Sequence, residues 1–121
     1  MSEEFKLSKI GVIMLGTSDM EASVAFYKDI LGLDFTGAHG PFAFFNGGGV
    51  TLALNPALGT PSDEKSSVEV VFSVEHVRDA YERLKERGVE FRIEPRGVAG
   101  PMWATDFRDP DGHTLSIFGP E

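Results

Sequence analysis

The chain repeats one pattern twice: a short apolar run, an amphipathic segment and a closing glycine. The closing glycines, Gly32 and Gly88, lie 56 residues apart, and the apolar runs before them are offset by 57 residues, from Val12 to Glu69. Self-similarity at a fixed spacing indicates one supersecondary unit used twice. Because the chain has 121 residues, two such units are expected to share one domain rather than form two independent ones.

Each unit is predicted to contain a strand, a helix and three further strands. In the first unit, a strand at 10–16 leads into a helix that starts after the N-cap pair Ser18 and Asp19 and ends at Gly32. In the second unit, a strand at 68–74 leads into a helix from about 75 to 87. The remaining strands are predicted at 33–36, 42–46 and 50–54, and at 89–94, 102–108 and 113–118.

The predicted fold class is α+β, with two βαβββ modules forming paired concave sheets that share a cleft and carry their helices on the outer side. A single domain covers residues 1–121. Module one spans about 5–55, a linker rich in turn formers about 56–66, and module two about 67–119. Two such sheets leave long edges and an open apolar cleft, so we expect a homodimer.

The acidic balance and the absence of cysteine exclude several classes of function. Nineteen Asp and Glu against 11 Lys and Arg give a net charge of −8, which disfavours nucleic acid and membrane surfaces as partners. Without cysteine the chain has no disulfide framework, thiolate zinc site or cysteine nucleophile. No signal-like N-terminal segment and no bilayer-length apolar run is visible. We therefore expect a cytoplasmic protein whose partner is a small molecule.

Strand alternation predicts a mostly apolar cleft that carries one carboxylate. The residues expected to face it are Val12, Met14, Glu69, Val71, Ser116 and Phe118. Apolar walls with a few polar groups are typical of small-molecule pockets. Two interpretations stay open for Glu69, a ligand-binding acid or a solvent-facing strand residue. Two also stay open for Trp103, a core aromatic or a stacking wall at the cleft rim.

Several segments together resemble the vicinal oxygen chelate superfamily, which includes glyoxalase I, extradiol dioxygenases, fosfomycin-modifying enzymes and bleomycin-binding resistance proteins. They are 19–27 (DMEASVAFY), 31–33 (LGL), 80–84 (AYERL), 88–91 (GVEF) and 107–113 (FRDPDGH). The resemblance covers nearly the whole chain. It implies the paired βαβββ fold with a site in the concave cleft, but not one particular reaction, because the scaffold supports several chemistries.

The resemblance also implies where a catalytic metal would be held. The superfamily's ligand positions fall on Val12, Ala53, Glu69 and Ser116, of which only Glu69 is a good ligand for a hard cation. A divalent site needs about three or four converging protein donors. The three histidines, His39, His76 and His113, lack the spacing that would place two imidazoles on one metal. We therefore expect no metal ligands and no cofactor.

The first functional interpretation is a non-catalytic binding protein, similar to bleomycin-type resistance proteins, with a metal-free cleft for an amphipathic ligand. The net charge and Glu69 favour a cation over an anion. The alternative is a glyoxalase-like or dioxygenase-like enzyme with one divalent metal anchored by Glu69. A third is an accessory domain with a vestigial cleft. No catalytic residue is predicted. The predicted ligand-binding residues are Val12, Met14, Ala53, Glu69, Val71, Trp103, Ser116 and Phe118.

Overall fold

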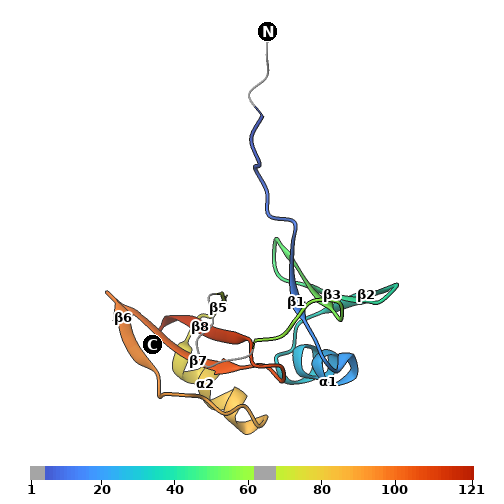
Figure 1. Ribbon diagram of the computed structural model, residues 1–121. Helices are drawn as coiled ribbons and strands as arrows, with labels where there is room; N and C mark the ends of the chain where they lie inside the picture. The colour runs from blue at the N-terminus through green and yellow to red at the C-terminus, as the bar shows by residue number, and fades with distance from the viewer. Residues whose placement is uncertain (1–4, 62–67) are drawn as a thin grey trace.

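The computed structural model describes residues 5–61 and 68–121, and these form two modules that lie side by side (Figure 1). Each module holds a four-stranded sheet, with strand order β1-β4-β3-β2 in module one and β5-β8-β7-β6 in module two. In both sheets the first strand runs parallel to the last, and the other pairs are antiparallel. This confirms the predicted α+β class with two βαβββ modules.

Module one begins at an apolar strand and turns at once into a short helical segment. Its elements are β1 (Val12–Gly16), α1 (Met20–Ala25), the π-helical turn η1 (Phe26–Ile30), β2 (Phe35–His39), β3 (Phe42–Asn46) and β4 (Thr51–Asn55). The Ala22 N–H donates to Asp19 Oδ1 at 3.2 Å, so Asp19 caps α1 as predicted. Gly32 leaves the helical segment with φ +82°, a conformation that favours glycine.

Module two repeats the topology with a longer helix. Its elements are β5 (Glu69–Ser73), α2 (Val77–Glu86), β6 (Arg96–Ala99), β7 (Met102–Arg108) and β8 (Thr114–Pro120). The apolar stripe of α2 buries Val77, Tyr81 and Leu84 against the sheet, as its spacing predicts. The helix begins two residues later than expected because His76 has an extended backbone and acts as the N-cap.

The predicted strand at 89–94 is wrong. That segment makes a single bridge, Phe91 to Phe107, and the edge strand is β6, on the far side of Pro95. Val89 is buried and the Phe91 ring packs between Tyr81 and Phe107, with centroids 4.7 and 5.2 Å away. These side chains fix the segment by packing, and a proline cannot donate a hydrogen bond to a ladder.

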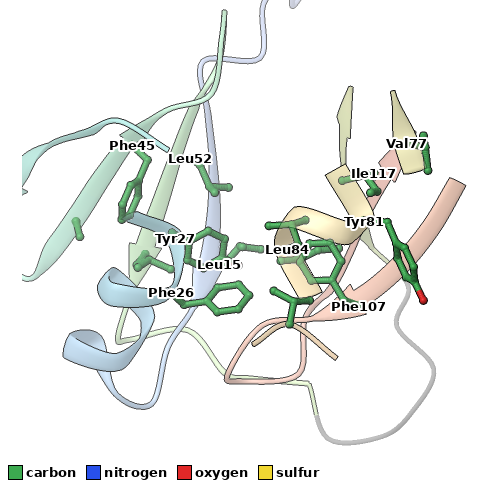
Figure 2. Packing of buried hydrophobic residues seen from close by; sticks show 14 residues of the cluster. Leu15, Phe26, Tyr27, Phe45, Leu52, Val77, Tyr81, Leu84, Phe107 and Ile117 are labelled. Carbon is green, nitrogen blue, oxygen red and sulfur yellow. The ribbon is translucent and has the colours of Figure 1, made fainter. Parts of the chain in front are cut away.

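The hydrophobic core is drawn from both modules. Tyr27 and Phe45 of module one and Phe107 and Leu115 of module two have no exposed surface, and all belong to one cluster of buried residues. Figure 2 shows side chains of module one meeting Leu84 and Phe107 of module two. Fully burying a side chain of this size contributes roughly 1.5–3 kcal/mol, so this shared packing holds the modules together.

The predicted linker, 56–66, lies partly outside the described residues, and its described part folds over the end of β1. A Cβ at Gly16 would overlap the carbonyl oxygen of Gly59, which explains the glycine there.

In the part of the chain that the structure describes, no helix is long and apolar enough to cross a bilayer.

Candidate functional site

The predicted cleft residues of module one lie on the edge strand β1 and on its neighbour β4. Val12 is paired with Thr51 and Met14 with Ala53 across the parallel β1–β4 ladder. Val12 is 46% exposed and Met14 is 40% exposed, whereas Ala53 has no exposed surface. Ala53 is also paired with Phe44 on β3. Val12 and Met14 are therefore accessible to a ligand, and Ala53 lies covered among its neighbours.

The predicted cleft residues of module two lie on β5 and β8. Val71 is paired with Ser116, Ser73 with Phe118, and Glu69 with Thr114. Glu69 is exposed and Val71 is 49% exposed, whereas Ser116 is only 5% exposed. The accessible part of this face is therefore the β5 edge, with a carboxylate beside an apolar side chain.

A cavity of about 210 Å³, here called the Glu69 cavity, lies between the β5 edge and module one. Val71 flanks Glu69 in its wall, and Ile13, Thr51 and Leu52 line it from β1 and β4. Among the described residues that line the cavity, Glu69 is the one charged group. This is the composition of a small-molecule pocket, with apolar walls and few orienting polar groups.

Trp103 does not lie at the rim of this face. In the β7–β8 ladder Trp103 is paired with Gly119, whereas Asp106 is paired with Ser116. Odd and even residues of a strand point to opposite faces, so Trp103 shares the face of buried Phe107. The guanidinium of Arg78, on α2, lies 5.5 Å from the centre of its ring. The core interpretation of Trp103 therefore agrees with the structure, and the stacking-wall interpretation does not.

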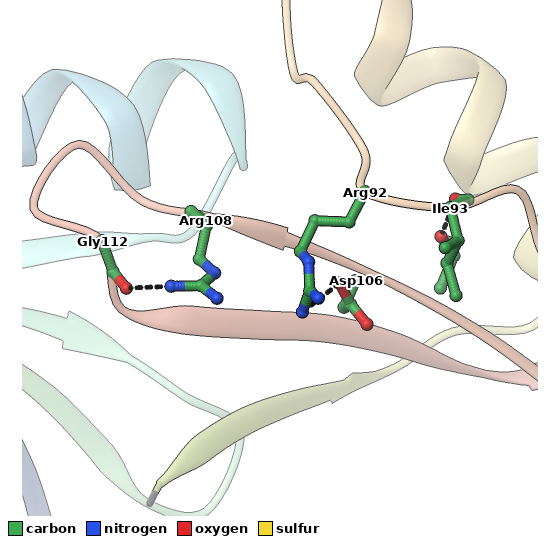
Figure 3. A network of polar contacts seen from close by, with 6 residues as sticks. Arg92, Ile93, Asp106, Arg108 and Gly112 are labelled. Atoms are coloured by element: carbon green, nitrogen blue, oxygen red, sulfur yellow. Dashed lines mark hydrogen bonds and ion pairs between the residues drawn. The ribbon is translucent and has the colours of Figure 1, made fainter. Parts of the chain in front are cut away.

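The structure adds charged residues that the sequence analysis missed. Asp106 and Arg108 of β7 are paired with Ser116 and Thr114 and so share their face. Arg92 lies 3.5 Å from Asp106 Oδ1, and Arg108 donates to the Gly112 carbonyl oxygen at 3.0 Å (Figure 3). The turn predicted at 109–112 fixes the register between β7 and β8. Alternation of side chains along 102–108 could then have placed Asp106 and Arg108 on the face of Ser116 and Thr114.

The side chains at the superfamily's metal positions do not form a donor set. Glu69 is the only carboxylate among them, and Val12 and Ala53 cannot coordinate. Among residues 5–61 and 68–121, no group of three or more His, Cys, Asp or Glu could hold a metal ion. A divalent ion needs three or four such donors, so the residues present do not fit the metal that the superfamily's enzymes use.

The histidines are placed apart from one another. The His39 ring packs against Phe44, with 5.7 Å between the ring centres, and His76 caps α2. His113 Nε2 lies 2.8 Å from the Gly16 carbonyl oxygen, to which it donates because a carbonyl only accepts. His113 thus joins the modules instead of facing the predicted cleft.

The β7–β8 turn makes the main polar contact between the modules. Tyr27 donates its hydroxyl proton to Asp109 Oδ2 at 2.7 Å, and this pair is buried. Burial, followed by the charge of Asp109, raises the pKa of Tyr27 far above its ordinary value of 10.0, so the phenol stays protonated and donates. The pair is thus a buried hydrogen bond that links the two modules.

Asp111, in the same turn, accepts hydrogen bonds from residues at the start of the first helical segment. Ser18 donates to Asp111 Oδ1 through its backbone N–H at 3.0 Å and its hydroxyl at 2.5 Å, and Ser23 donates to Oδ2 at 3.2 Å. Partial burial acts to raise the pKa of Asp111, but the hydrogen bonds from Ser18 and Ser23 outweigh it and hold the pKa below the ordinary 3.8.

A family model described as the Glyoxalase/Bleomycin resistance protein/Dioxygenase superfamily matches residues 9–117. The chain belongs to this superfamily, as the sequence motifs indicated. A Metallothiol transferase FosB from Staphylococcus haemolyticus is 32% identical over 112 residues, which cover 89% of this chain and 81% of the relative.

Solved structures share the fold. A glyoxalase/bleomycin resistance protein/dioxygenase from Nocardioides matches with a TM-score of 0.81 at 32% identity, over 97% of this chain and 86% of the other. TnmS3, an antibiotic binding protein from Streptomyces sp. CB03234, matches with a TM-score of 0.78 at 24% identity, over 98% of this chain and all of the other. The second likeness shows the fold alone.

Proposed function

We propose that the protein is a non-catalytic binding protein whose metal-free Glu69 cavity holds an amphipathic small molecule with a cationic group. The observation that carries the proposal is the position of Glu69, the one charged group in the described lining of an apolar cavity. A carboxylate beside apolar walls matches a ligand with a cationic group on an apolar body.

The exposed apolar side chains around Glu69 would supply most of the binding free energy. Val68 is 61% exposed and Val71 49%, and both line the cavity. Removing apolar surface from water is worth roughly 25 cal/mol per Å² before the cost of association. The carboxylate would then fix the ligand's orientation and favour a cation.

The relatives support a role in handling small molecules. TnmS3 is an antibiotic binding protein, and FosB is a metallothiol transferase. The donor set at Val12, Ala53, Glu69 and Ser116 gives no basis for carrying over metal chemistry. A binding role without metal chemistry is therefore the one that the donor set and the cavity lining support.

The test is a calorimetric titration of aromatic ammonium compounds and of neutral compounds of the same shape. Glu69→Gln keeps the side-chain shape and removes the charge. It should weaken the cations by about 1.5 kcal/mol, the low end for a hydrogen bond to a charged group because Glu69 is exposed, and change the neutral compounds little. Glu82→Gln, on the exposed surface of α2, is the matched control. Equal binding of the cations by the wild type and Glu69→Gln would refute the cationic ligand.

The metalloenzyme alternative rests on the same Glu69, and metal content distinguishes the two. After dialysis against Zn, Ni, Mn or Fe, elemental analysis should find no stoichiometric metal. A tight one-to-one ratio would favour the enzyme. If the cavity bound neither metal nor any tested small molecule, the accessory-domain interpretation would replace both.

We also propose a homodimer, because apolar side chains lie exposed on the sheet faces of both modules. Val12, Met14 and Val71 are each 40% exposed or more, and exposed apolar groups of this kind favour association. Sedimentation equilibrium should give about twice the 13.2 kDa of one chain. The mass of a single chain across micromolar concentrations would contradict this.

A further inference from the structure

We propose a second binding site, for a small amphipathic carboxylate, in a cavity of about 200 Å³ between the end of the first helical segment and module two. Leu31 and Leu33 line it from module one, and Ala80, Leu84 and Phe107 line it from module two. The cavity, here called the arginine cavity, shares the lining residues Leu33 and Phe72 with the Glu69 cavity, so the two cavities are neighbours.

The charge at this cavity is opposite to that of its neighbour. Arg83 and Arg87 are the charged groups among its described lining residues, in a protein of net charge −8. Arg87 donates through Nη1 to the Ile30 carbonyl oxygen at 2.8 Å, which holds its guanidinium beside the first helical segment. Arg83 pairs through Nε with Asp79 at 2.9 Å.

These contacts leave each guanidinium able to bind an anion. A guanidinium has five N–H donors in a planar fork that matches a carboxylate, and each recorded contact uses one of them. Asp79 offsets part of the positive charge, so the rim carries about one net positive charge. That charge selects an anion over a neutral or cationic ligand of the same shape.

The size of the cavity restricts the apolar part of the ligand. A cavity of about 150 Å³ lined by apolar side chains can hold benzene, and this one is about 200 Å³. It therefore fits one aromatic ring and one or two methylene groups. The ligand class is an arylalkyl monocarboxylate, with the ring among the leucines and the carboxylate at the arginines.

The test compares benzoate, phenylacetate, 3-phenylpropionate and 4-phenylbutyrate with 2-phenylethanol, by calorimetry at low salt. Affinity should rise about fourfold with each added methylene and then stop rising when the cavity is full. The carboxylates should bind more tightly than the alcohol, and added salt should reduce that difference. Equal affinity of carboxylate and alcohol at low salt would overturn the proposal.

Three variants distinguish binding in the arginine cavity from binding elsewhere on the protein surface. Ala80→Leu fills the cavity and should abolish binding of the whole series, with circular dichroism confirming the fold. Arg83→Gln should weaken the carboxylates about two- to fivefold, as expected for an exposed ion pair, and leave the alcohol unchanged. Arg96→Gln removes a charge from the exposed edge strand β6 and should change nothing. Carboxylate binding that survives both Ala80→Leu and Arg83→Gln would place the ligand elsewhere.

The outcome is independent of the function proposed for the Glu69 cavity. Glu69→Gln should leave 3-phenylpropionate binding unchanged, and Ala80→Leu should leave the binding of ammonium compounds unchanged. If Glu69→Gln weakened the carboxylate series as much as Arg83→Gln does, a separate carboxylate site would be excluded.

Discussion

The β3–β4 turn of module one and the β7–β8 turn of module two close equivalent hairpins, yet they differ in their contacts with the other module. The first is the glycine run 47–49, in which Gly48 has φ +74°. The Gly48 N–H donates to Asn46 Oδ1 at 2.8 Å, a contact within the same hairpin. The second carries Asp109 and Asp111, which accept hydrogen bonds from Tyr27 and Ser18 of module one. One turn therefore only closes its sheet, and the other also joins the modules.

The difference shows that topology and module contact are specified separately. The two sheets have the same strand order although the module-one turn has no acidic residue and shares only its final glycine, Gly49, with Gly112 of the module-two turn, so the order does not depend on the acidic turn. The relative position of the modules depends on the shared core and on the side chains of that turn. The comparison predicts that removing the buried carboxylate of Asp109, in the β7–β8 turn, costs more than any change in the β3–β4 turn.

The largest effect is expected from Asp109→Ala. Asp109 is 5% exposed and accepts from the Tyr27 hydroxyl, the Asp111 N–H and the His113 N–H. Removing the carboxylate leaves one buried donor, the Tyr27 hydroxyl, and two partly buried N–H donors without this partner, and each buried donor left unpaired costs about 1–3 kcal/mol. We expect the free energy of unfolding to fall by about 3–5 kcal/mol, measured by urea denaturation.

Two companion variants sharpen this result. Tyr27→Phe removes one of the three donors and should cost less than Asp109→Ala. Asn46→Ala, in the equivalent position before the glycine turn, breaks a single exposed hydrogen bond and should cost about 0.5 kcal/mol. A loss below 1 kcal/mol for Asp109→Ala would mean that the core alone positions the modules.

The next largest effect is expected from Gly48→Ala. At φ +74° a residue with a Cβ costs about 1 kcal/mol more than glycine, although an added Cβ would meet nothing within 4 Å. The penalty is therefore conformational, and Gly48→Asn should cost less because asparagine tolerates this region. Thermal unfolding of both variants measures it, and an unchanged Tm for Gly48→Ala would show that the turn can relax.

Much of the fold follows from local patterns in the sequence. The strands Phe42–Asn46 and Met102–Arg108 match their predicted bounds, and Gly32 and Gly88 end the helical segments with φ +82° and +96°. These features depend on neighbouring residues only, namely alternation between turns and a glycine after an apolar stripe. Local patterns therefore predicted most of the elements and their order, but not the edge strand β6, which lies at Arg96–Ala99 rather than at 89–94.

The site could be predicted only in part, because the residues that meet at a site are brought together by packing between elements. Trp103 is in phase with buried Phe107 along β7, so its side of the sheet could have been inferred, but its contact with Arg78 of α2 could not. Glu69 lies at a cavity because module one packs beside the β5 edge. No pattern within either module encodes that packing.

A smaller effect than that of Asp109→Ala, and one that depends on pH, is expected from Asp111→Asn. Hydrogen bonds from Ser18 and Ser23 hold the pKa of Asp111 below 3.8 in the folded protein, against the opposing effect of burial. Its carboxylate therefore stabilises the fold at pH values above the unfolded pKa of about 3.9. That contribution is lost as the pH falls through the lower folded pKa. Because Asp111 is partly exposed, we expect a cost at pH 7 of only about 0.5–1 kcal/mol.

Urea denaturation of the wild type and Asp111→Asn from pH 7 down to pH 2 measures this contribution. The difference in stability should be constant above about pH 5 and shrink toward zero as Asp111 is protonated in the wild type. Groups that titrate in both proteins cancel in the difference. Asp34→Asn, in the exposed segment before β2, is the matched control at a carboxylate outside the turn. A difference that stayed constant down to pH 2 would mean that the substitution removes some contact of Asp111 other than its charge, and the electrostatic part of the comparison between the two turns would be wrong.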